Sequence, residues 1–171
     1  MHFPPLDQVN PDAVQRLLDR AFGADRRART AYKVRGTAQA IPHLSFAAVE
    51  DGALLGTVQC WPVRLSADHG STHPLVMVGP VAVEPVRQGT GIGRALVTRA
   101  LDAARGTGED AALMLIGDAE YYRRFGFTAD RTGSWRLPGP VERHRLLARG
   151  DSVPDLAGLL GPALDERTDA P

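Results

Sequence analysis

The chain has 171 residues, of which 43% are hydrophobic, so it is long enough for one domain around a single core. Twenty basic and twenty acidic residues cancel, which argues against the strongly cationic surface of a nucleic-acid-binding protein. The first residues lack a signal-peptide pattern, no apolar run reaches the roughly 18 residues of a membrane span, and the one cysteine, Cys60, cannot form an internal disulfide. We therefore expect a soluble, cytoplasmic protein with no membrane or nucleic-acid partner.

The amino-terminal region predicts helices. Asn10 can cap a helix, Pro11 suits its first turn, and Gly23 suits its end. Between them, apolar residues recur at helical spacing, namely Val14, Leu17, Leu18, Ala21 and Phe22. The Arg-rich stretch 24–39 is expected to contain a second helix.

Three strands are expected next. Residues 44–50 and 53–65 flank Asp51-Gly52, a dipeptide typical of a tight hairpin because both residues tolerate positive φ. The third strand, residues 74–84, is interrupted by Gly79-Pro80. Since proline cannot donate a ladder hydrogen bond, this strand must have an edge, a bulge or a splay at that point.

The second half of the chain predicts a helix over residues 92–105, a buried strand over 111–116, and a short helix that Asp118 caps and Gly126 ends. Short strands are expected near 134–137 and 143–148. This alternation around one mixed sheet predicts a single α/β or α+β domain over residues 1–150. Residues 151–171 are expected to form an extension that is partly helical or disordered.

A glycine-rich turn at a strand-to-helix junction carries the main functional signal. Three glycines lie within five residues of the segment 88–94, so the backbone can approach a ligand closely and direct its N–H groups outward. The start of the following helix adds unpaired donors and a positive dipole end, which suits a pyrophosphate. Arg87 and Arg94 flank the turn and can pair with further phosphate charge.

Two common nucleotide-binding motifs do not fit this turn. A Walker loop needs Gly-Lys followed by Ser or Thr, and the chain has no such triplet. A Rossmann fingerprint would require glycine where Arg94 stands, and it would open the first βαβ unit rather than lie halfway along the chain. A nucleotide-dependent oxidoreductase is therefore disfavoured.

Two motifs in order resemble the GNAT superfamily of N-acetyltransferases. The spacing Gln88-x-x-Gly91-x-Gly93 after a Val-rich strand is similar to that family's acetyl-CoA motif, and residues 121–127, YYRRFGF, resemble its tyrosine-containing helix. Together they cover residues 44–127. The segments 79–83 and 137–147 are similar to the YhbS-like branch.

The resemblance implies a mixed, mostly antiparallel central sheet that is splayed at the acetyl-CoA site and flanked by helices. It also implies acetyl-CoA as co-substrate. The backbone of Val81, Ala82 and Val83 would bind the pantetheine arm. The pyrophosphate would be held, beside Arg87, by the backbone of Gln88, Gly89, Thr90, Gly91, Ile92, Gly93 and Arg94.

Tyr122 matches, by the same resemblance, the tyrosine that protonates the departing sulfur in many family members. No general base can be carried over, because the strand position that holds a carboxylate in some members is apolar here, with Met77 nearby. Glu84 is the nearest carboxylate to the cofactor turn and is taken as the candidate base. Glu50, His73 and Asp118 remain alternatives, and an amine captured already neutral would need none of them.

These features predict an N-acetyltransferase that moves an acetyl group from acetyl-CoA to a primary amine by direct transfer in a ternary complex. The expected acceptor is a small molecule. The alternatives are a protein amino group as acceptor and a non-catalytic acyl-CoA-binding or sensor domain. No His, Cys or Asp cluster has metal-ligand spacing, so no metal is expected. The resemblance leaves room for a homodimer.

Overall fold

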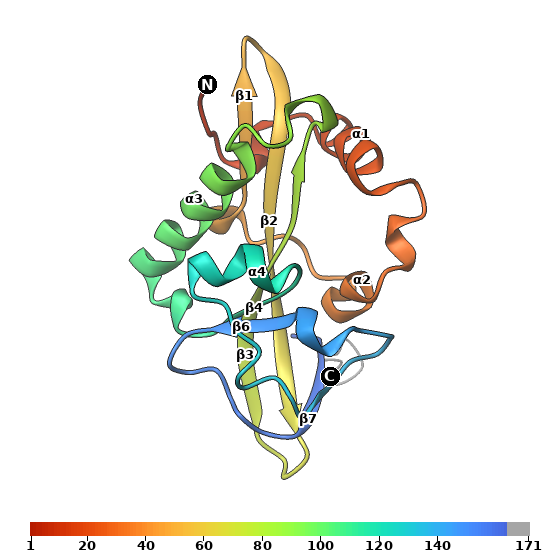
Figure 1. Ribbon diagram of the computed structural model, residues 1–171, viewed down its shortest axis with the longest axis vertical. Helices are drawn as coiled ribbons and strands as arrows, with labels where there is room; N and C mark the ends of the chain where they lie inside the picture. Colours follow the sequence, from red (N-terminus) through yellow and green to blue (C-terminus); the bar gives the residue numbers. More distant parts are fainter. Residues whose placement is uncertain (164–171) are drawn as a thin grey trace, which may run out of the picture. The chain divides into compact units, whose positions relative to one another are not determined.

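The computed structural model describes residues 1–163 and contains a mixed α/β arrangement with a curled sheet (Figure 1). By its internal packing the chain divides into two compact units. Unit 1 comprises Met1–Arg27, Ala40–Cys60 and Val78–Thr107, and unit 2 comprises Ala28–Gln39, Trp61–Met77 and the chain from Gly108 onward. The two units are described separately.

The sheet has seven strands in the order β5-β7-β2-β3-β4-β6, with β1 paired to β2 off this path. Two of its pairings, β3–β4 and β5–β7, are parallel, whereas β1–β2, β2–β7 and β4–β6 are antiparallel. The strand bounds are β1 Phe46–Glu50, β2 Ala53–Ala67, β3 Thr72–Val83, β4 Leu113–Ile116, β5 Trp135–Arg136, β6 Leu146–Arg149 and β7 Gly158–Pro162. The expected mixed sheet is confirmed.

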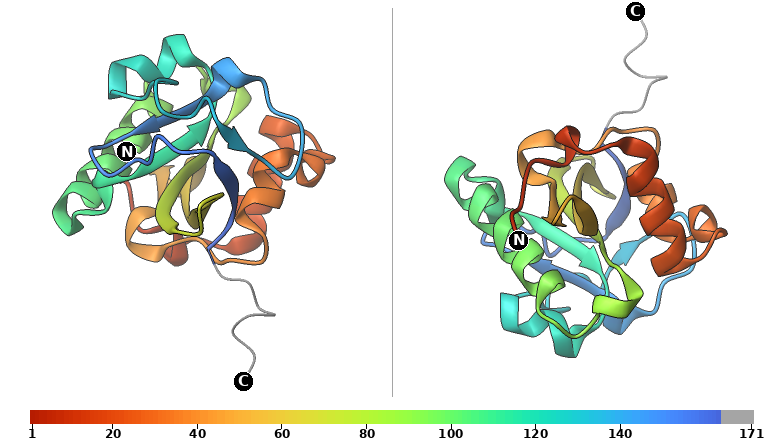
Figure 2. Two further views of the ribbon diagram at one scale, coloured as in Figure 1. Left: turned by 90° about the horizontal axis from the view of Figure 1, so that it is seen from below. Right: turned by 90° about the horizontal axis from the view of Figure 1, so that it is seen from above.

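Unit 1 contains α1 (Pro11–Phe22) and α3 (Ile92–Thr107), which lie on opposite sides of its strands in both views (Figures 1 and 2). The side chain of Asn10 caps α1 by accepting the N–H of Asp12, as its position before Pro11 predicts. The buried face of α1 packs on β3 through a cluster formed by Val14, Leu17, Leu18 and Ala82.

The packing of α3 depends on a glycine in β2. A Cβ at Gly56 would lie 2.9 Å from Leu96 and 3.0 Å from Ile92, so only glycine lets the helix approach the strand this closely. This contact seats the first turn of α3, and with it the glycine-rich turn that precedes the helix.

Unit 2 contains α2 (Thr30–Arg35), which packs on β7, and the one-turn helix α4 (Ala119–Tyr122). The second helix expected in the Arg-rich stretch 24–39 is confirmed as the six-residue α2. The predicted strands near 134–137 and 143–148 are present as β5 and β6.

The expectation of helix in the carboxyl-terminal extension is wrong over Gly158–Pro162, which forms β7 and pairs with β2 and β5. The burial alternates with a period of two, since Leu160 is buried and Leu159 is 46% exposed, and Gly158, Gly161 and Pro162 disfavour a helix. The boundary drawn at residue 150 remains a prediction. The disorder expected at the end of the chain falls on residues 164–171, outside the described residues.

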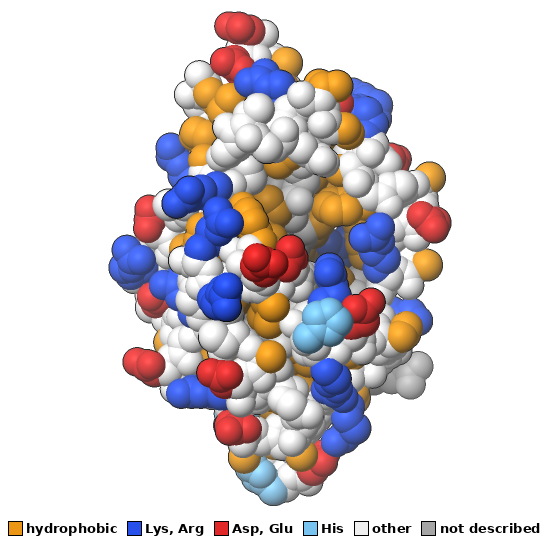
Figure 3. Space-filling model, in the orientation of Figure 1, with side chains coloured by type: hydrophobic (Ala, Val, Ile, Leu, Met, Phe, Trp, Pro, Cys, Tyr) orange, Lys and Arg blue, Asp and Glu red, His pale blue; other side chains and the backbone are white. Residues whose placement is uncertain are grey.

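The interruption predicted at Gly79-Pro80 lies inside β3, where Gly79 has a φ of 127° and the peptide bond to Pro80 is cis. The strand therefore departs from regular extended geometry just before Val81–Val83. Within the described part of the chain, no helix is both long enough and apolar enough to cross a bilayer. On the face in Figure 3, Lys and Arg side chains are interspersed with Asp and Glu.

Candidate functional site

The turn between β3 and α3 contains two glycines in the left-handed backbone conformation, and the space beside them is open. After Glu84, residues Pro85–Arg87 form one turn of 3-10 helix, and α3 begins at Ile92. Gly89 and Gly91 have φ values of 81° and 90°, which glycine adopts without strain. A Cβ added at either glycine would meet no protein atom within 4 Å. The space beside both glycines is therefore open to a ligand.

Six consecutive backbone N–H groups of this turn, from Gly89 to Arg94, donate to no other described residue. The first bond of α3 runs from the Ala95 N–H to the Gly91 carbonyl at 3.0 Å, so the groups before it are left unpaired by the helix. The Thr90 hydroxyl donates to the Arg87 carbonyl at 2.5 Å and thereby fixes the turn from within. With the positive end of a 16-residue helix behind them, these donors form an anion site.

The two arginines beside the turn differ in their availability. Arg87 Nη2 donates to Glu50 Oε2 at 2.9 Å, so part of its charge is already neutralised. Arg94 is exposed on the first turn of α3 and makes no ion pair with another described residue. Arg94 is therefore the freer cation for a phosphate.

The segment that precedes the turn, Val81–Val83, lies at the end of β3. Ala82 is fully buried in the α1 cluster, whereas Val81 and Val83 are half-buried. The Glu84 N–H donates to the Leu55 carbonyl at 2.8 Å, which ties the end of this strand to β2. The strand end is thereby held rigidly next to the six free donors.

Glu84 is engaged by Arg20 of α1. The Arg20 guanidinium donates to both carboxylate oxygens, through Nε at 3.2 Å to each and through Nη2 at 2.8 Å to Oε2. This hydrogen bonding raises the pKa of Arg20 above its ordinary value. Both carboxylate oxygens are thus occupied by Arg20, and this contact argues against Glu84 as general base.

Tyr122 belongs to unit 2 and is half-buried in an aromatic cluster. Its ring centroid lies 4.9 Å from that of Tyr121 and 6.2 Å from that of Phe127. Gly117 makes room for the ring, because a Cβ there would lie 2.7 Å from Tyr122 Cε2. Burial, and to a smaller extent Tyr121, raises the pKa of the Tyr122 hydroxyl to about 12. The hydroxyl has no hydrogen-bond partner among the described residues and keeps its proton at neutral pH.

The other candidate side chains are occupied in structural roles. Asp118 caps α4 by accepting the Glu120 N–H at 3.0 Å, and Glu50 pairs with Arg87. His73 Nε2 lies 2.8 Å from the Ser71 hydroxyl. Cys60 is 1% exposed and packs in the core. Within residues 1–163, no three His, Cys, Asp or Glu side chains come together as metal ligands.

A family model described as an acetyltransferase (GNAT) domain matches residues 5–129 of the chain. The chain belongs to the GNAT acetyltransferase family. The expected enzyme class, an acetyltransferase, is thereby confirmed, and the match includes both the glycine-rich turn and the tyrosine helix.

Relatives of this GNAT acetyltransferase include the uncharacterized N-acetyltransferase YhbS of Escherichia coli K12, which is 33% identical over 162 residues, 91% of this chain and 90% of YhbS. The crystal structure of E. coli YhbS in complex with CoA matches with a TM-score of 0.71 and 26% identity, covering 92% of this chain and 87% of that one. A GNAT acetyltransferase from Brucella melitensis in complex with acetyl-CoA matches with a TM-score of 0.53 and 28% identity, covering 88% and 96%. The predicted YhbS-like branch is confirmed.

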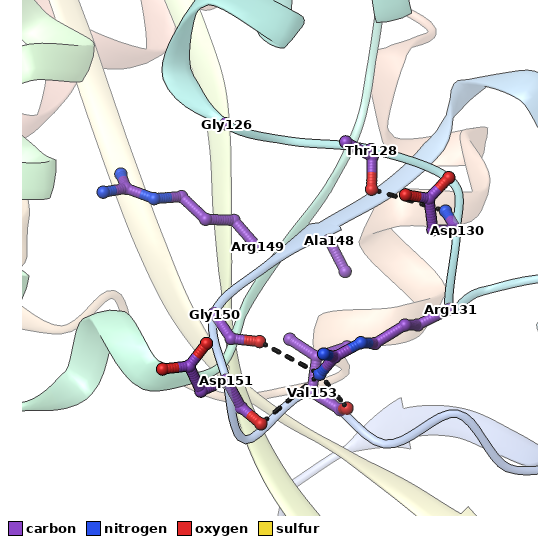
Figure 4. A pocket seen from close by; sticks show the side chains of 9 residues that line it. All are labelled: Gly126, Thr128, Asp130, Arg131, Ala148, Arg149, Gly150, Asp151 and Val153. Carbon is purple, nitrogen blue, oxygen red and sulfur yellow. Dashed lines mark hydrogen bonds between the residues drawn. The ribbon is translucent and has the colours of Figure 1, made fainter.

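Unit 2 of this GNAT protein also has an open pocket of about 220 Å³ (Figure 4). Arg131 crosses it and donates to the carbonyls of Gly150, Asp151 and Val153 at 3.1–3.4 Å. That guanidinium therefore holds the loop after β6. None of the sequence-predicted site residues lines this pocket, whose lining comprises Gly126, Thr128, Asp130, Arg131, Ala148, Arg149, Gly150, Asp151 and Val153.

Three polar residues of unit 1 could not be predicted from the sequence as functional candidates. Arg20 meets Glu84 across 64 residues of sequence, and its position on the exposed side of a helix gave no hint of that partner. Thr57 and Gln59 are buried in β2 without hydrogen-bond partners for Thr57 Oγ1 and Gln59 Oε1. Polar residues at alternate positions of an apolar strand were the available signal for these two.

Proposed function

We propose that this protein transfers the acetyl group of acetyl-CoA to a primary amine, by direct transfer in a ternary complex, and that the acceptor is a small molecule. The observation that carries the proposal is the row of six unpaired N–H donors from Gly89 to Arg94 at the start of α3. Membership of the GNAT family supports the reaction, and the CoA-bound and acetyl-CoA-bound neighbours support the cofactor.

The cofactor would lie along unit 1. The unpaired N–H groups from Gly89 to Arg94 would hold the pyrophosphate, whereas the Gln88 N–H already donates to the Pro85 carbonyl. Arg94 would pair with further phosphate charge. The backbone of Val81, Ala82 and Val83 would hydrogen-bond the pantetheine arm as an added strand. The two glycines with positive φ and open space beside them fit this group, since any side chain there would occupy the volume of the phosphates.

In the transfer step, the amine nitrogen attacks the thioester carbonyl carbon with its lone pair. The C–N bond forms, the C–S bond breaks, the nitrogen loses one proton, and the CoA sulfur leaves as thiolate or thiol. Tyr122 supplies the hydroxyl donor for that sulfur in this proposal. Its raised pKa keeps the donor protonated over the whole physiological range.

Glu84 remains the sequence-based candidate for the base, but its fork with Arg20 supports a different assignment. We assign Glu84 to holding α1 against the end of β3, which keeps the cofactor strand in place. Without a free carboxylate at this strand end, proton removal falls to water or to the amine itself before binding.

Calorimetric titration and a thiol-release assay test the proposal together. Acetyl-CoA should bind, NAD and ATP should not, and a panel of small amines should produce free CoA thiol above the hydrolysis background. Binding without turnover on any small amine or peptide amine would instead indicate an acyl-CoA sensor domain. Turnover on peptide amines alone would indicate that the acceptor is a protein amino group rather than a small molecule.

A further inference from the structure

Strand β2 carries two polar side chains in the interior of unit 1 that lack hydrogen-bond partners. Thr57 is 0% and Gln59 is 8% exposed, and neither Thr57 Oγ1 nor Gln59 Oε1 meets a partner within the described residues. Buried polar atoms are nearly always paired, because each unpaired one costs about 1–3 kcal/mol. Two of them, two residues apart, indicate a partner that belongs to a ligand.

Both side chains lie on the face of β2 that is turned away from α3. Side chains alternate along a strand, so Thr57 and Gln59 share one face and Gly56 lies on the other. A Cβ at Gly56 would touch Leu96 and Ile92 of α3, which identifies its side. Because α1 and α3 lie on opposite sides of these strands (Figure 1), the face of β2 that is turned away from α3 is the face toward α1.

The same two residues lie beside the proposed cofactor strand. β2 turns back into β3 through the hairpin closed by the Ala67 N–H to Ser71 carbonyl bond of 2.8 Å, so the two strands are antiparallel. The Glu84 N–H donates to the Leu55 carbonyl, and a Cβ at Gly56 would lie 3.0 Å from the Ala82 carbonyl oxygen, so this part of β2 lies beside the end of β3. Thr57 is the next residue of β2 after Gly56. Gln59 follows one step further along the same face.

We propose that Gln59 and Thr57 bind the acceptor, with Gln59 Oε1 and Thr57 Oγ1 accepting hydrogen bonds from the N–H groups of a neutral primary amine. This inference rests on the proposed acetyl transfer. A carboxamide oxygen can only accept, so its missing partner must be a donor. When both N–H groups of the amine donate hydrogen bonds to the strand, the nitrogen lone pair stays free to attack the thioester.

The surroundings favour the neutral form of the amine. The α1-facing side is lined by the apolar cluster of Val14, Leu17, Leu18 and Ala82, and Glu84 at the strand end is already paired with Arg20. Burying an ammonium against neutral groups is costly, so such a site lowers the pKa of a bound amine. The remaining 8% exposure of Gln59, with its soft terminal torsion, allows its oxygen to turn toward an entering ligand.

The substrate class is therefore a small aliphatic amine that is bound deprotonated, and the enzyme needs no carboxylate base to do this. For amines of similar shape and decreasing basicity, such as ethylamine, 2-fluoroethylamine and 2,2-difluoroethylamine, the pH at which kcat/KM reaches half its maximum should follow the pKa of each amine. A half-maximum at one fixed pH for all three would indicate a titrating enzyme group and overturn this part of the inference.

Gln59→Met and Thr57→Val test the contacts with near-isosteric changes. Each should raise KM for the most active amine of the panel roughly three- to tenfold, as expected for one neutral hydrogen bond. The Kd of acetyl-CoA should stay unchanged. Thr98→Val, on the exposed face of α3, is the matched control and should change neither value.

A purely structural role gives a different result. Thr57→Val would then raise Tm, because it removes a buried unpaired hydroxyl, while KM for the amine stays at the wild-type value in both variants. That outcome overturns the inference but leaves the proposed transfer intact. A wild-type enzyme that binds acetyl-CoA yet acetylates no amine would overturn the proposed function, and this inference with it.

Discussion

Replacing Gly91 by alanine separates the ligand role of the turn from its effect on folding. Gly91 has a φ of 90°, and a Cβ there would meet no protein atom within 4 Å. The free energy of unfolding of the Gly91→Ala variant should therefore fall only by the conformational cost of a side chain at positive φ, about 1–2 kcal/mol. For a chain of this size we expect Tm to fall by roughly 2–4 °C for each kcal/mol.

The cost to acetyl-CoA binding should be larger. The methyl group would enter the volume that the pyrophosphate needs, and the loss of even one charge-assisted hydrogen bond costs about 1.5–3 kcal/mol. The Kd of acetyl-CoA should accordingly rise roughly 10- to 100-fold in calorimetric titration.

Gly52→Ala is the matched control. Gly52 lies in the β1–β2 turn of the same unit, has a φ of 78° and also has no protein atom within 4 Å of an added Cβ. It should show a similar fall in Tm and a wild-type Kd. Equal acetyl-CoA affinity in Gly91→Ala and wild type would refute the assignment of the turn to the cofactor.

Four further substitutions address the two arginines beside the turn, Glu84 and Tyr122. Arg94→Gln should weaken acetyl-CoA binding about tenfold, more than Arg87→Gln, whose guanidinium already pairs with Glu50; equal effects in calorimetry would contradict this ranking. Glu84→Gln should change kcat less than threefold or so with an unshifted pH–rate profile, whereas a roughly hundredfold loss would restore Glu84 as the base. Tyr122→Phe should lower kcat roughly tenfold at constant acetyl-CoA Kd. The raised pKa of Tyr122 also predicts that the wild type loses stability between pH 10 and 12, because in this range the tyrosine ionises more readily in the unfolded chain than in the folded one. Tyr122→Phe should lack this loss, as denaturant titrations at pH 9 and 11 would show.

Local chemistry explains why much of the fold was predictable. The Asn10 cap, the helical spacing of Val14, Leu17 and Leu18, and the Asp51-Gly52 hairpin act within a few residues of sequence. The glycine-rich turn is also predictable from local sequence, because glycine is the residue that adopts positive φ without strain. Such features need no knowledge of tertiary partners.

The features that the sequence did not predict depend on partners far away in the sequence. The sequence of β7 has two adjacent leucines and therefore shows no alternation of polar and apolar residues; its pairing with β2 makes it a strand. The fork between Arg20 and Glu84 spans 64 residues, and it changes the chemistry expected of that carboxylate. The isolation of Gln59 Oε1 inside unit 1 likewise exists only once the chain has folded. A sequence motif therefore suffices to propose the cofactor turn, whereas the proposal for the acid–base groups depends on contacts that only the folded chain shows.

The proton balance of the reaction connects these findings. A Tyr122 hydroxyl with a pKa of about 12 is a much weaker acid than a thiol with a pKa near 8.5, and full transfer to a free thiolate would be uphill by roughly 5 kcal/mol. Tyr122 is therefore better suited to stabilise the leaving sulfur by a hydrogen bond than to surrender its proton. When a neutral amine attacks, the nitrogen becomes positively charged and strongly acidic, so the proton that the sulfur needs can come from the substrate itself, through water. A site that binds the amine neutral, with Glu84 already paired, then requires no side chain that titrates near pH 7.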